Sequence, residues 1–232
     1  MLEIEHFSKT YGKTPACRDI SFSLPEGSVT VLLGPNGAGK STIMKAIAGL
    51  LRFEGTIRID GEDNTSPFSR RKIGYIPEIP SFYSNLTVAE HIEFLARAYR
   101  LKDYRARGDA LLEKFELSEH RKKFGDELSK GMQQKLNLCL GLLIEPKILL
   151  LDEPFIGLDP HAIRQLRKTV TDLREEGKIL LISTHIIDSI DALWDRTIIM
   201  KKGQVKADVR KEEAGPSLEE LFFAVTEGGK ED

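Results

Sequence analysis

The chain has few of the residues that would confine it to a special class of protein. It contains two cysteines in 232 residues, Cys17 and Cys139, too far apart for a disulfide framework or a paired metal site. Its 34 Lys+Arg and 36 Asp+Glu nearly cancel to a formal charge of −2, so bulk charge does not hold it on nucleic acid or an anionic membrane. We therefore expect buried, reduced cysteines, a cytosolic setting and no nucleic-acid partner.

Long hydrophobic runs are also missing. The most apolar stretch, 136–151, is interrupted at 145–147 by Glu-Pro-Lys, whereas a membrane span needs about 20 mostly apolar residues. The first six residues are acidic and polar, so they do not predict a signal peptide. With 41% hydrophobic and 30% charged residues, the composition is typical of a globular protein that does not cross a membrane by itself.

Two kinds of strand pattern are present. Alternation of apolar and polar residues is typical of half-buried strands in an antiparallel sheet. It occurs at 2–7, 20–24 and 55–60. Short unbroken apolar runs are typical of parallel strands covered by helices on both faces. They occur at 29–33, 148–151 and 179–182.

Helical patterns fill the region between these strand sets. Thr87 and Glu90 form a capping box, after which apolar residues recur at helical spacing as far as Tyr99. Further helices are predicted within 110–115 and 132–143. The end of the chain, at 217–225, predicts an amphipathic helix that docks on its own core.

The order of these elements predicts an α/β fold. We expect a core with a mostly parallel sheet, an N-terminal antiparallel β subdomain, and a helical subdomain inserted at about 80–145. No Pro/Gly/Ser-rich linker marks a boundary. The sequence therefore predicts a single domain over 1–232.

A glycine-rich segment follows the strand predicted at 29–33. Residues 34–41 fit the pattern G-x-x-x-x-G-K-[ST] of a phosphate loop and precede a helix-capable stretch. The alternative is a plain glycine-rich turn, but such a turn needs neither this pattern nor a strand before it and a helix after it. A side-chain-free backbone can wrap phosphate oxygens closely with its N–H groups. Lys40 would neutralise β- and γ-phosphate charge, and the Ser41 hydroxyl would bind Mg²⁺. The α/β core is therefore expected to be that of a phosphate-loop NTPase. The expected nucleotide-binding residues here are Gly34, Pro35, Asn36, Gly37, Ala38, Gly39, Lys40, Ser41 and Thr42.

Two adjacent carboxylates end the buried strand predicted at 148–151. Ligands bind at the carboxyl ends of parallel strands, so Asp152 is a candidate to hold Mg²⁺. The chain turns at Pro154, which would let Glu153 face the γ-phosphate as the base that polarises an attacking water. A solvated Asp-Glu turn is the alternative, and the accompanying phosphate loop favours the functional interpretation.

A third motif distinguishes among classes of nucleotidase: residues 128–133 read Leu-Ser-Lys-Gly-Met-Gln. They lie shortly before Asp152 and resemble the signature loop of ATP-binding cassette (ABC) proteins, with Tyr11, Asp159 and His185 also in family order. The chain thus resembles the nucleotide-binding subunit of an ABC transporter over nearly its whole length. That resemblance implies ATP and Mg²⁺ as cofactors and ATPase sites formed between two cassettes facing head to tail.

The resemblance also implies roles for individual residues. Tyr11 would stack on adenine, unless it only packs on its own sheet. Ser129 and Gly131 would start a helix aimed at the γ-phosphate held by the other subunit, and Ser129 could equally be a plain N-cap. Asp159 would lie in a loop at the dimer interface, although Asp before Pro also suits a helix start. His185 would contact the γ-phosphate, where a structural histidine is the alternative.

Two departures from the family pattern affect these expectations. The signature loop has Lys130 and Met132 where Gly and Gln are common, so the site gains a cation. Glu78 occupies the position usually held by a glutamine near Mg²⁺, where a carboxylate changes the local charge balance. Both departures resemble the branch that drives export-type permeases, including drug and antibiotic exporters.

The function expected from the sequence is therefore an ATP-hydrolysing subunit of an ABC transporter. It would act as a homodimer or with a paired cassette subunit, catalysis would use Glu153, His185 and Lys40, and Ser41, Asp152 and Glu78 would surround the metal. A separate integral membrane permease would dock beside the helical subdomain and the Glu78 loop, on the cytoplasmic face of the membrane. Residues 79–83 are the candidate contact, and burial of these side chains within this domain is the alternative. The alternatives are a soluble cassette ATPase and a nucleotide-dependent switch acting on a non-transport partner.

Overall fold

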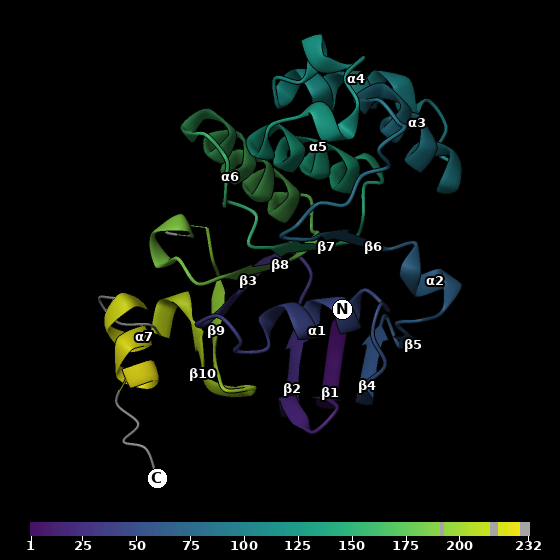
Figure 1. Ribbon diagram of the computed structural model, residues 1–232. Helices are drawn as coiled ribbons and strands as arrows, with labels where there is room; N and C mark the ends of the chain where they lie inside the picture. The colour runs from purple at the N-terminus through teal and green to yellow at the C-terminus, as the bar shows by residue number, and fades with distance from the viewer. Residues whose placement is uncertain (191–192, 214–217, 228–232) are drawn as a thin grey trace.

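Two β-sheets lie on either side of one helix in the computed structural model, which describes residues 1–190, 193–213 and 218–227 (Figure 1). The smaller sheet is antiparallel, with strand order β2-β1-β4-β5. Its strands are β1 (Leu2–Tyr11), β2 (Thr14–Leu24), β4 (Glu54–Ile59) and β5 (Glu62–Asp63). Every second residue of β2 near its end is buried, as predicted for a sheet with one wet face.

The larger sheet has the order β10-β9-β3-β8-β7-β6, and only β10 runs antiparallel to its neighbour. Its strands are β3 (Ser28–Leu33), β6 (Ile73–Ile76), β7 (Ile148–Asp152), β8 (Ile179–Thr184), β9 (Arg196–Lys201) and β10 (Gln204–Arg210). β3, β7 and β8 are almost entirely buried because both faces of this sheet are covered. The predicted α/β class with two kinds of sheet is confirmed.

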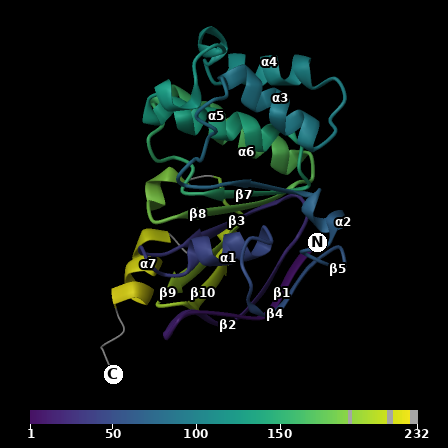
Figure 2. The same ribbon diagram turned by 45° about the vertical axis from the view of Figure 1, so that its right-hand side comes forward.

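The helices form separate layers around the larger sheet (Figure 2). They are α1 (Lys40–Ile47), α2 (Pro67–Arg70), α3 (Val88–Ala98), α4 (Tyr104–Lys114), α5 (Lys130–Leu143), α6 (Pro160–Glu175) and α7 (Leu218–Glu227). Among the described residues, short 3-10 helices span Ser118–His120, Gly125–Glu127, Ile187–Ser189 and Lys211–Glu213. α1 lies between the two sheets, and α3 to α6 cover the opposite face of the larger one.

Several helix predictions hold with shifted ends. The capping box at Thr87 and Glu90 is formed, and α3 ends one residue before Tyr99. α4 begins six residues before the predicted 110, because its first turns are polar and carry no apolar period. Cys17 and Cys139 are free and buried, as expected.

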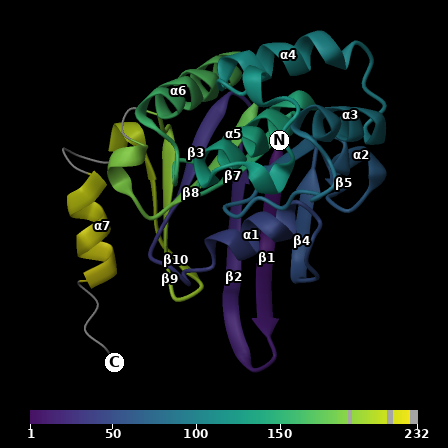
Figure 3. The ribbon, with the colours of Figure 1, turned by 45° about the horizontal axis from the view of Figure 1, so that its top comes forward.

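The last helix packs against its own protein, beside β9 and away from α3, α4 and α5 (Figure 3). Its apolar residues touch the core at Leu218, Leu221, Phe222 and Val225. Ser217, the first residue of the predicted helix, lies outside the described residues. Over 1–190, 193–213 and 218–227, every helix falls short of the length and hydrophobicity that crossing a bilayer requires.

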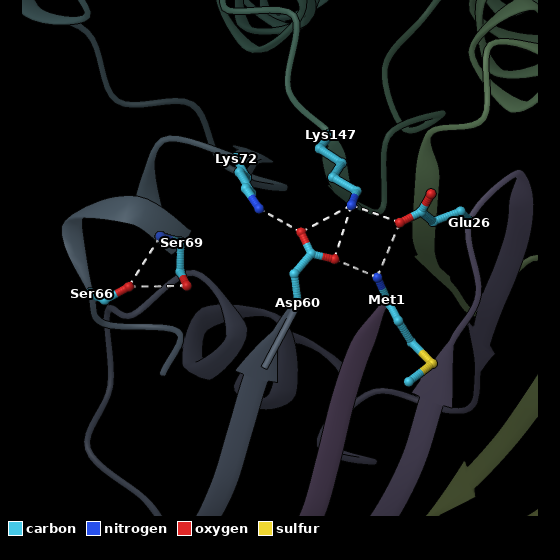
Figure 4. A network of polar contacts seen from close by, with 7 residues as sticks. All are labelled: Met1, Glu26, Asp60, Ser66, Ser69, Lys72 and Lys147. Carbon is cyan, nitrogen blue, oxygen red and sulfur yellow. Dashed lines mark hydrogen bonds and ion pairs between the residues drawn. The ribbon is translucent and has the colours of Figure 1, made fainter. Parts of the chain in front are cut away.

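A network of charged groups joins the two sheets at the edge where β4 ends (Figure 4). The Asp60 carboxylate accepts from Lys72, from Lys147 at 2.9 Å and from the Met1 amino group at 2.7 Å. Lys147 also pairs with Glu26 at 2.6 Å. Burial alone would raise the pKa of Asp60, but these three cationic donors outweigh it and hold that pKa far below its usual range.

Candidate functional site

The site lies where β3, β7 and β8 end side by side. The chain leaves β3 into the glycine-rich loop 34–39, leaves β7 at Asp152, and leaves β8 at Thr184, directly before His185. Because these strands are parallel and adjacent, their carboxyl ends share one edge of the sheet. The structure therefore brings together five groups that are far apart in sequence: Lys40, Ser41, Asp152, Glu153 and His185.

The loop has a backbone that only glycine adopts easily. Gly37 and Gly39 have φ values of 79° and 103°, in the left-handed region. A Cβ on Gly39 would also lie 2.7 Å from Cys17 Sγ and 2.9 Å from the Ala16 carbonyl oxygen. The absence of side chains there lets the loop pass close to β2, and leaves its other side open.

That open side is a cavity of about 420 Å³. Its lining residues are Ala16, Asn36, Gly37, Ala38, Gly39, Lys40, Ser41, Thr42, Glu78 and Glu153. The first N–H groups of α1 have no acceptor within the helix, and they begin at Lys40 on the cavity wall. The wall therefore combines backbone donors, the positive end of a helix dipole and a lysine, which suits a phosphate group.

Lys40 is 6% exposed, and its ammonium group is held by three oxygens. Nζ donates to the Gly34 carbonyl at 2.7 Å and to the Pro35 carbonyl at 3.4 Å, and it lies 3.4 Å from Glu153 Oε1. A buried ammonium requires such partners. Two of the three are neutral carbonyls, so an anionic phosphate would compete well for this lysine.

Asp152 is 2% exposed and accepts hydroxyl hydrogen bonds on both carboxylate oxygens. Ser41 Oγ donates to Oδ1 at 3.0 Å, Ser183 Oγ donates to the same oxygen, and the Tyr75 hydroxyl donates to Oδ2 at 3.2 Å. Burial and the neighbouring Asp152 charge raise the pKa of Tyr75, so its hydroxyl stays protonated.

The oxygens of Ser41 and Asp152 are the donor type that Mg²⁺ prefers. Glu78 also lines the cavity and could add a third oxygen. Clusters of three or more His, Cys, Asp and Glu that could hold a metal alone are absent from the described part of the chain. The residues present thus fit a Mg²⁺ ion that is shared with nucleotide phosphates, as such ions usually are.

Glu153 follows Asp152 with a φ of 48°, a left-handed backbone that a non-glycine residue seldom adopts. Its side chain is 5% exposed. Oε1 lies 2.9 Å from His185 Nδ1 and 3.4 Å from Lys40 Nζ, whereas Oε2 is buried without a hydrogen-bond partner. One carboxylate oxygen is therefore anchored and the other is left free, which is rare for a buried polar atom.

Four predicted residues neither line this cavity nor bond to a side chain that lines it. Tyr11 ends β1 with 48% of its surface exposed and has Lys9 Nζ 5.1 Å from its ring centre. Ser129 caps α5, where its Oγ accepts from the Met132 amide at 3.3 Å. A Cβ on Gly131 would lie 2.9 Å from the Gly157 carbonyl oxygen, so a glycine is needed at that approach.

Asp159 is the fourth of these residues and caps α6. Its Oδ1 accepts from the Ala162 amide at 2.9 Å, and its Oδ2 pairs with Lys135 Nζ at 2.7 Å. The hydrogen bond from Lys135, followed by that from the Ala162 amide, lowers the pKa of Asp159. Within one chain, Asp159 and Ser129 thus have the helix-start geometry that was the alternative to an interface role.

The segment 79–83 divides into a packed and an exposed part. Phe82 packs against the core and meets the His91 ring edge-on at 5.3 Å, so burial, the alternative for this segment, holds for Phe82. Ile79 is 79% exposed, and Tyr83 is 55% exposed beside Phe94 at a ring distance of 5.1 Å. Exposed apolar side chains are therefore present at Ile79 and at the contacting pair Tyr83 and Phe94.

Sequence reasoning missed Tyr75, Ser183 and Lys135. Tyr75 and Ser183 lie near the carboxyl ends of β6 and β8. The carboxyl ends of neighbouring parallel strands share one edge of the sheet, and this rule is the signal that could have identified both residues. Lys135 lies on the second turn of α5 and follows no strand, so no such signal marks it.

The chain matches known proteins over most of its length. A family model described as ABC transporter matches residues 17–156. The lantibiotic transport ATP-binding protein SrtF of Streptococcus pyogenes is 35% identical over 223 residues, which cover 96% of each protein. A solved structure of an ATP-binding subunit of an ABC transporter has a TM-score of 0.92 and 35% identity, covering 97% of this chain and 99% of that one. A dimeric structure of a bacterial ABC transporter cassette has a TM-score of 0.83 at 28% identity, covering 90% of this chain and 98% of that one.

Proposed function

The chain belongs to the ABC transporter family as an ATP-binding subunit, and we propose that it hydrolyses Mg²⁺-ATP within a dimer to drive a separate membrane permease. The proposal treats 1–232 as one cassette domain with a helical subdomain at about 80–145. The observation that carries it is the Glu153 carboxylate, with Oε1 anchored by His185 and Lys40 and Oε2 buried but free.

Nucleotide binding is assigned to the cavity at the glycine-rich loop. The loop N–H groups and the start of α1 hold phosphate oxygens, and Lys40 exchanges its carbonyl partners for the β- and γ-phosphates. Ser41 and Asp152 hold Mg²⁺, which neutralises charge on the phosphates, and Glu78 faces the same cavity.

Hydrolysis is assigned to Glu153 and His185. The free Oε2 accepts a proton from a water as the water oxygen bonds to the γ-phosphorus and the bond to the β-phosphate oxygen breaks, leaving ADP and phosphate. His185 is the positioning group for Glu153, because it holds Oε1 at 2.9 Å. Its partly exposed ring can also reach a bound γ-phosphate.

Dimerisation gives a role to Ser129, Gly131 and Asp159, which lie outside the cavity. Ser129 and Gly131 form the start of α5, where a helix dipole suits a phosphate held by a second subunit. Lys130 adds a cation at the same helix start, and Asp159 contributes to the interface loop. Tyr11 stacks on the adenine of its own subunit. The similarity to a dimeric cassette structure supports this arrangement.

A permease is the partner assigned to the exposed surface of Ile79, Tyr83 and Phe94. This surface begins one residue after Glu78, so a docked partner could influence the nucleotide cavity. The similarity to a lantibiotic transport protein favours an exporter of antibiotic-like compounds. Such a complex would place the chain on the cytoplasmic face of the membrane.

The test is Glu153→Gln, which keeps the side-chain shape but removes charge and basicity. We expect ATP binding to persist while phosphate release falls by about 100-fold or more. The trapped ATP should also raise the dimer fraction in light scattering with Mg²⁺-ATP. Glu113→Gln, at an exposed glutamate on α4, is the matched control and should behave as wild type. Full turnover by Glu153→Gln would exclude Glu153 as the general base. A protein that stays monomeric at saturating ATP would favour the alternative function, a nucleotide-dependent switch.

A further inference from the structure

Three hydroxyl groups from three different elements reach the Asp152 carboxylate. Ser41 belongs to α1, Ser183 to β8 and Tyr75 to β6. Both serines donate to Oδ1, whereas Tyr75 is the hydroxyl donor to Oδ2. Each oxygen of the carboxylate therefore has a distinct partner, and the rotation of the carboxylate about its last bond is defined.

The sheet register determines this arrangement. Tyr75 pairs with Leu150 in the parallel ladder of β6 and β7, and Leu150 is two residues before Asp152. Residues two apart on a strand share a face, so Tyr75 and Asp152 point to the same side. Ser183 pairs directly with Asp152, and α1 covers this side of the sheet. The contact between Tyr75 and Asp152 thus follows from backbone pairing.

The Tyr75 hydroxyl differs from the two serine hydroxyls in what else it does. Ser183 Oγ also accepts from the Glu153 amide at 3.2 Å, and Ser41 is itself a metal ligand in the proposed function. Tyr75 makes its hydroxyl hydrogen bond to Asp152, and its ring packs on the core between the sheets. Removing only this oxygen would therefore free Oδ2 and leave the other contacts in place.

We propose, resting on the function assigned above, that Tyr75 is a positioning residue for the Mg²⁺ site. Its hydroxyl holds Oδ2 so that Oδ1 stays turned toward Ser41. A Ser41 oxygen that bound the metal through a lone pair would keep its proton for Asp152 Oδ1, so the two serines would hold one carboxylate oxygen and Tyr75 the other. Tyr75 also lies three residues before Glu78, so it joins the loop near the permease surface to the metal side of the cavity.

Tyr75→Phe tests the role because it keeps the ring and removes the hydroxyl. Substitutions that remove a partner of a metal ligand commonly weaken metal affinity by about 10- to 100-fold. Asp152 keeps Ser183 here, so we expect the lower end, roughly a tenfold weaker binding of Mn²⁺ to the ATP-bound protein, followed by electron paramagnetic resonance. The Mg²⁺ concentration that half-saturates ATPase activity should rise by the same factor.

Two controls separate positioning from a structural effect. ATP affinity measured in EDTA should stay within about twofold of wild type, because Tyr75 does not line the nucleotide cavity. Tyr99→Phe, at an exposed tyrosine that follows α3, should change neither measurement. Ser183→Ala removes a hydroxyl from Oδ1 and should weaken Mn²⁺ binding in the same direction, which gives a second variant if Tyr75→Phe folds poorly.

The outcomes distinguish this inference from the proposed function. A wild-type protein that fails to bind ATP, or whose turnover is independent of Mg²⁺, would overturn both. Wild-type metal dependence together with unchanged Mn²⁺ affinity in Tyr75→Phe would overturn only the positioning role. An equal loss of ATP affinity in EDTA and in Mg²⁺ would also overturn it, since that result means a structural tyrosine.

Discussion

Replacing Asp60 with Asn tests how the two sheets are held together. The substitution removes the charge shared by Lys72, Lys147 and the Met1 amino group but keeps the side-chain size (Figure 4). The three losses are unequal, because Lys147 and the amino group keep Glu26 at 2.6 and 3.3 Å. Lys72 loses its ionic partner and keeps only the face of the Phe68 ring at 3.7 Å.

The expected loss is moderate. The Asp60 side chain is 23% exposed and the side chains of its partners are 22% to 54% exposed, so each interaction is partly screened by water. Taking about 0.5 kcal/mol for each of three partly exposed ion pairs, the free energy of unfolding should fall by about 1 to 2 kcal/mol. For a domain of this size, that corresponds to a decrease in Tm of roughly 2 to 6 °C.

The pH dependence gives a sharper check. The folded protein holds the pKa of Asp60 below its unfolded value of about 3.9, so the stabilisation is complete above that pH. It is lost as the pH falls through the folded-state pKa. The difference in unfolding free energy between wild type and Asp60→Asn, from urea titrations, should therefore be constant near neutrality and shrink below pH 4.

Asp126→Asn, at an exposed aspartate, is the control and should leave stability within about 0.5 kcal/mol at every pH. Salt at 1 M should reduce the Asp60→Asn effect, since the network is partly exposed. An Asp60→Asn protein as stable as wild type at neutral pH and low salt would refute the reasoning, and so would a difference that grows on acidification.

Two further predictions concern the proposed function. Tyr11→Ala should weaken ATP binding by about 1 to 3 kcal/mol, the value of an aromatic ring stacked on a base, whereas Tyr11→Phe should bind as wild type in fluorescence titrations. Equal ATP affinity in all three proteins would mean that adenine lies elsewhere. Ile79→Ser should leave the ATPase of the isolated subunit unchanged and reduce its stimulation by the reconstituted permease, measured as phosphate release. Full stimulation would exclude Ile79 from the docking surface.

The sequence predicted those strands in which the spacing of apolar residues is itself typical of a strand. β2, β3, β7 and β8 were found because alternation or an unbroken apolar run reports burial on one face or two. β6 was missed because it has four residues, one of them a glycine. β9 and β10, a hairpin at the sheet edge, were also missed. The apolar run in β9 is only three residues long and has charged residues on either side, so it does not stand out as a strand.

The candidate site was predicted where one segment carries its own chemistry. The phosphate loop needs glycines, a lysine and a serine at fixed spacing, and Gly39 has a backbone and a close approach to Cys17 that require glycine. Glu153 was selected from its place after a buried strand. Its anchored and free oxygens depend on Lys40 and His185, whose positions relative to it come from the fold.

The sequence by itself determined the class of fold, the phosphate loop and the acidic strand end, because each depends on residues that are neighbours along the chain. Only the tertiary structure decided which side chains surround Asp152. Tyr75, Ser41 and Ser183 are separated from it by 77, 111 and 31 residues, and they meet it through strand register and helix packing. Register follows from how whole strands bury their faces together, so no local pattern specifies which hydroxyls reach that carboxylate.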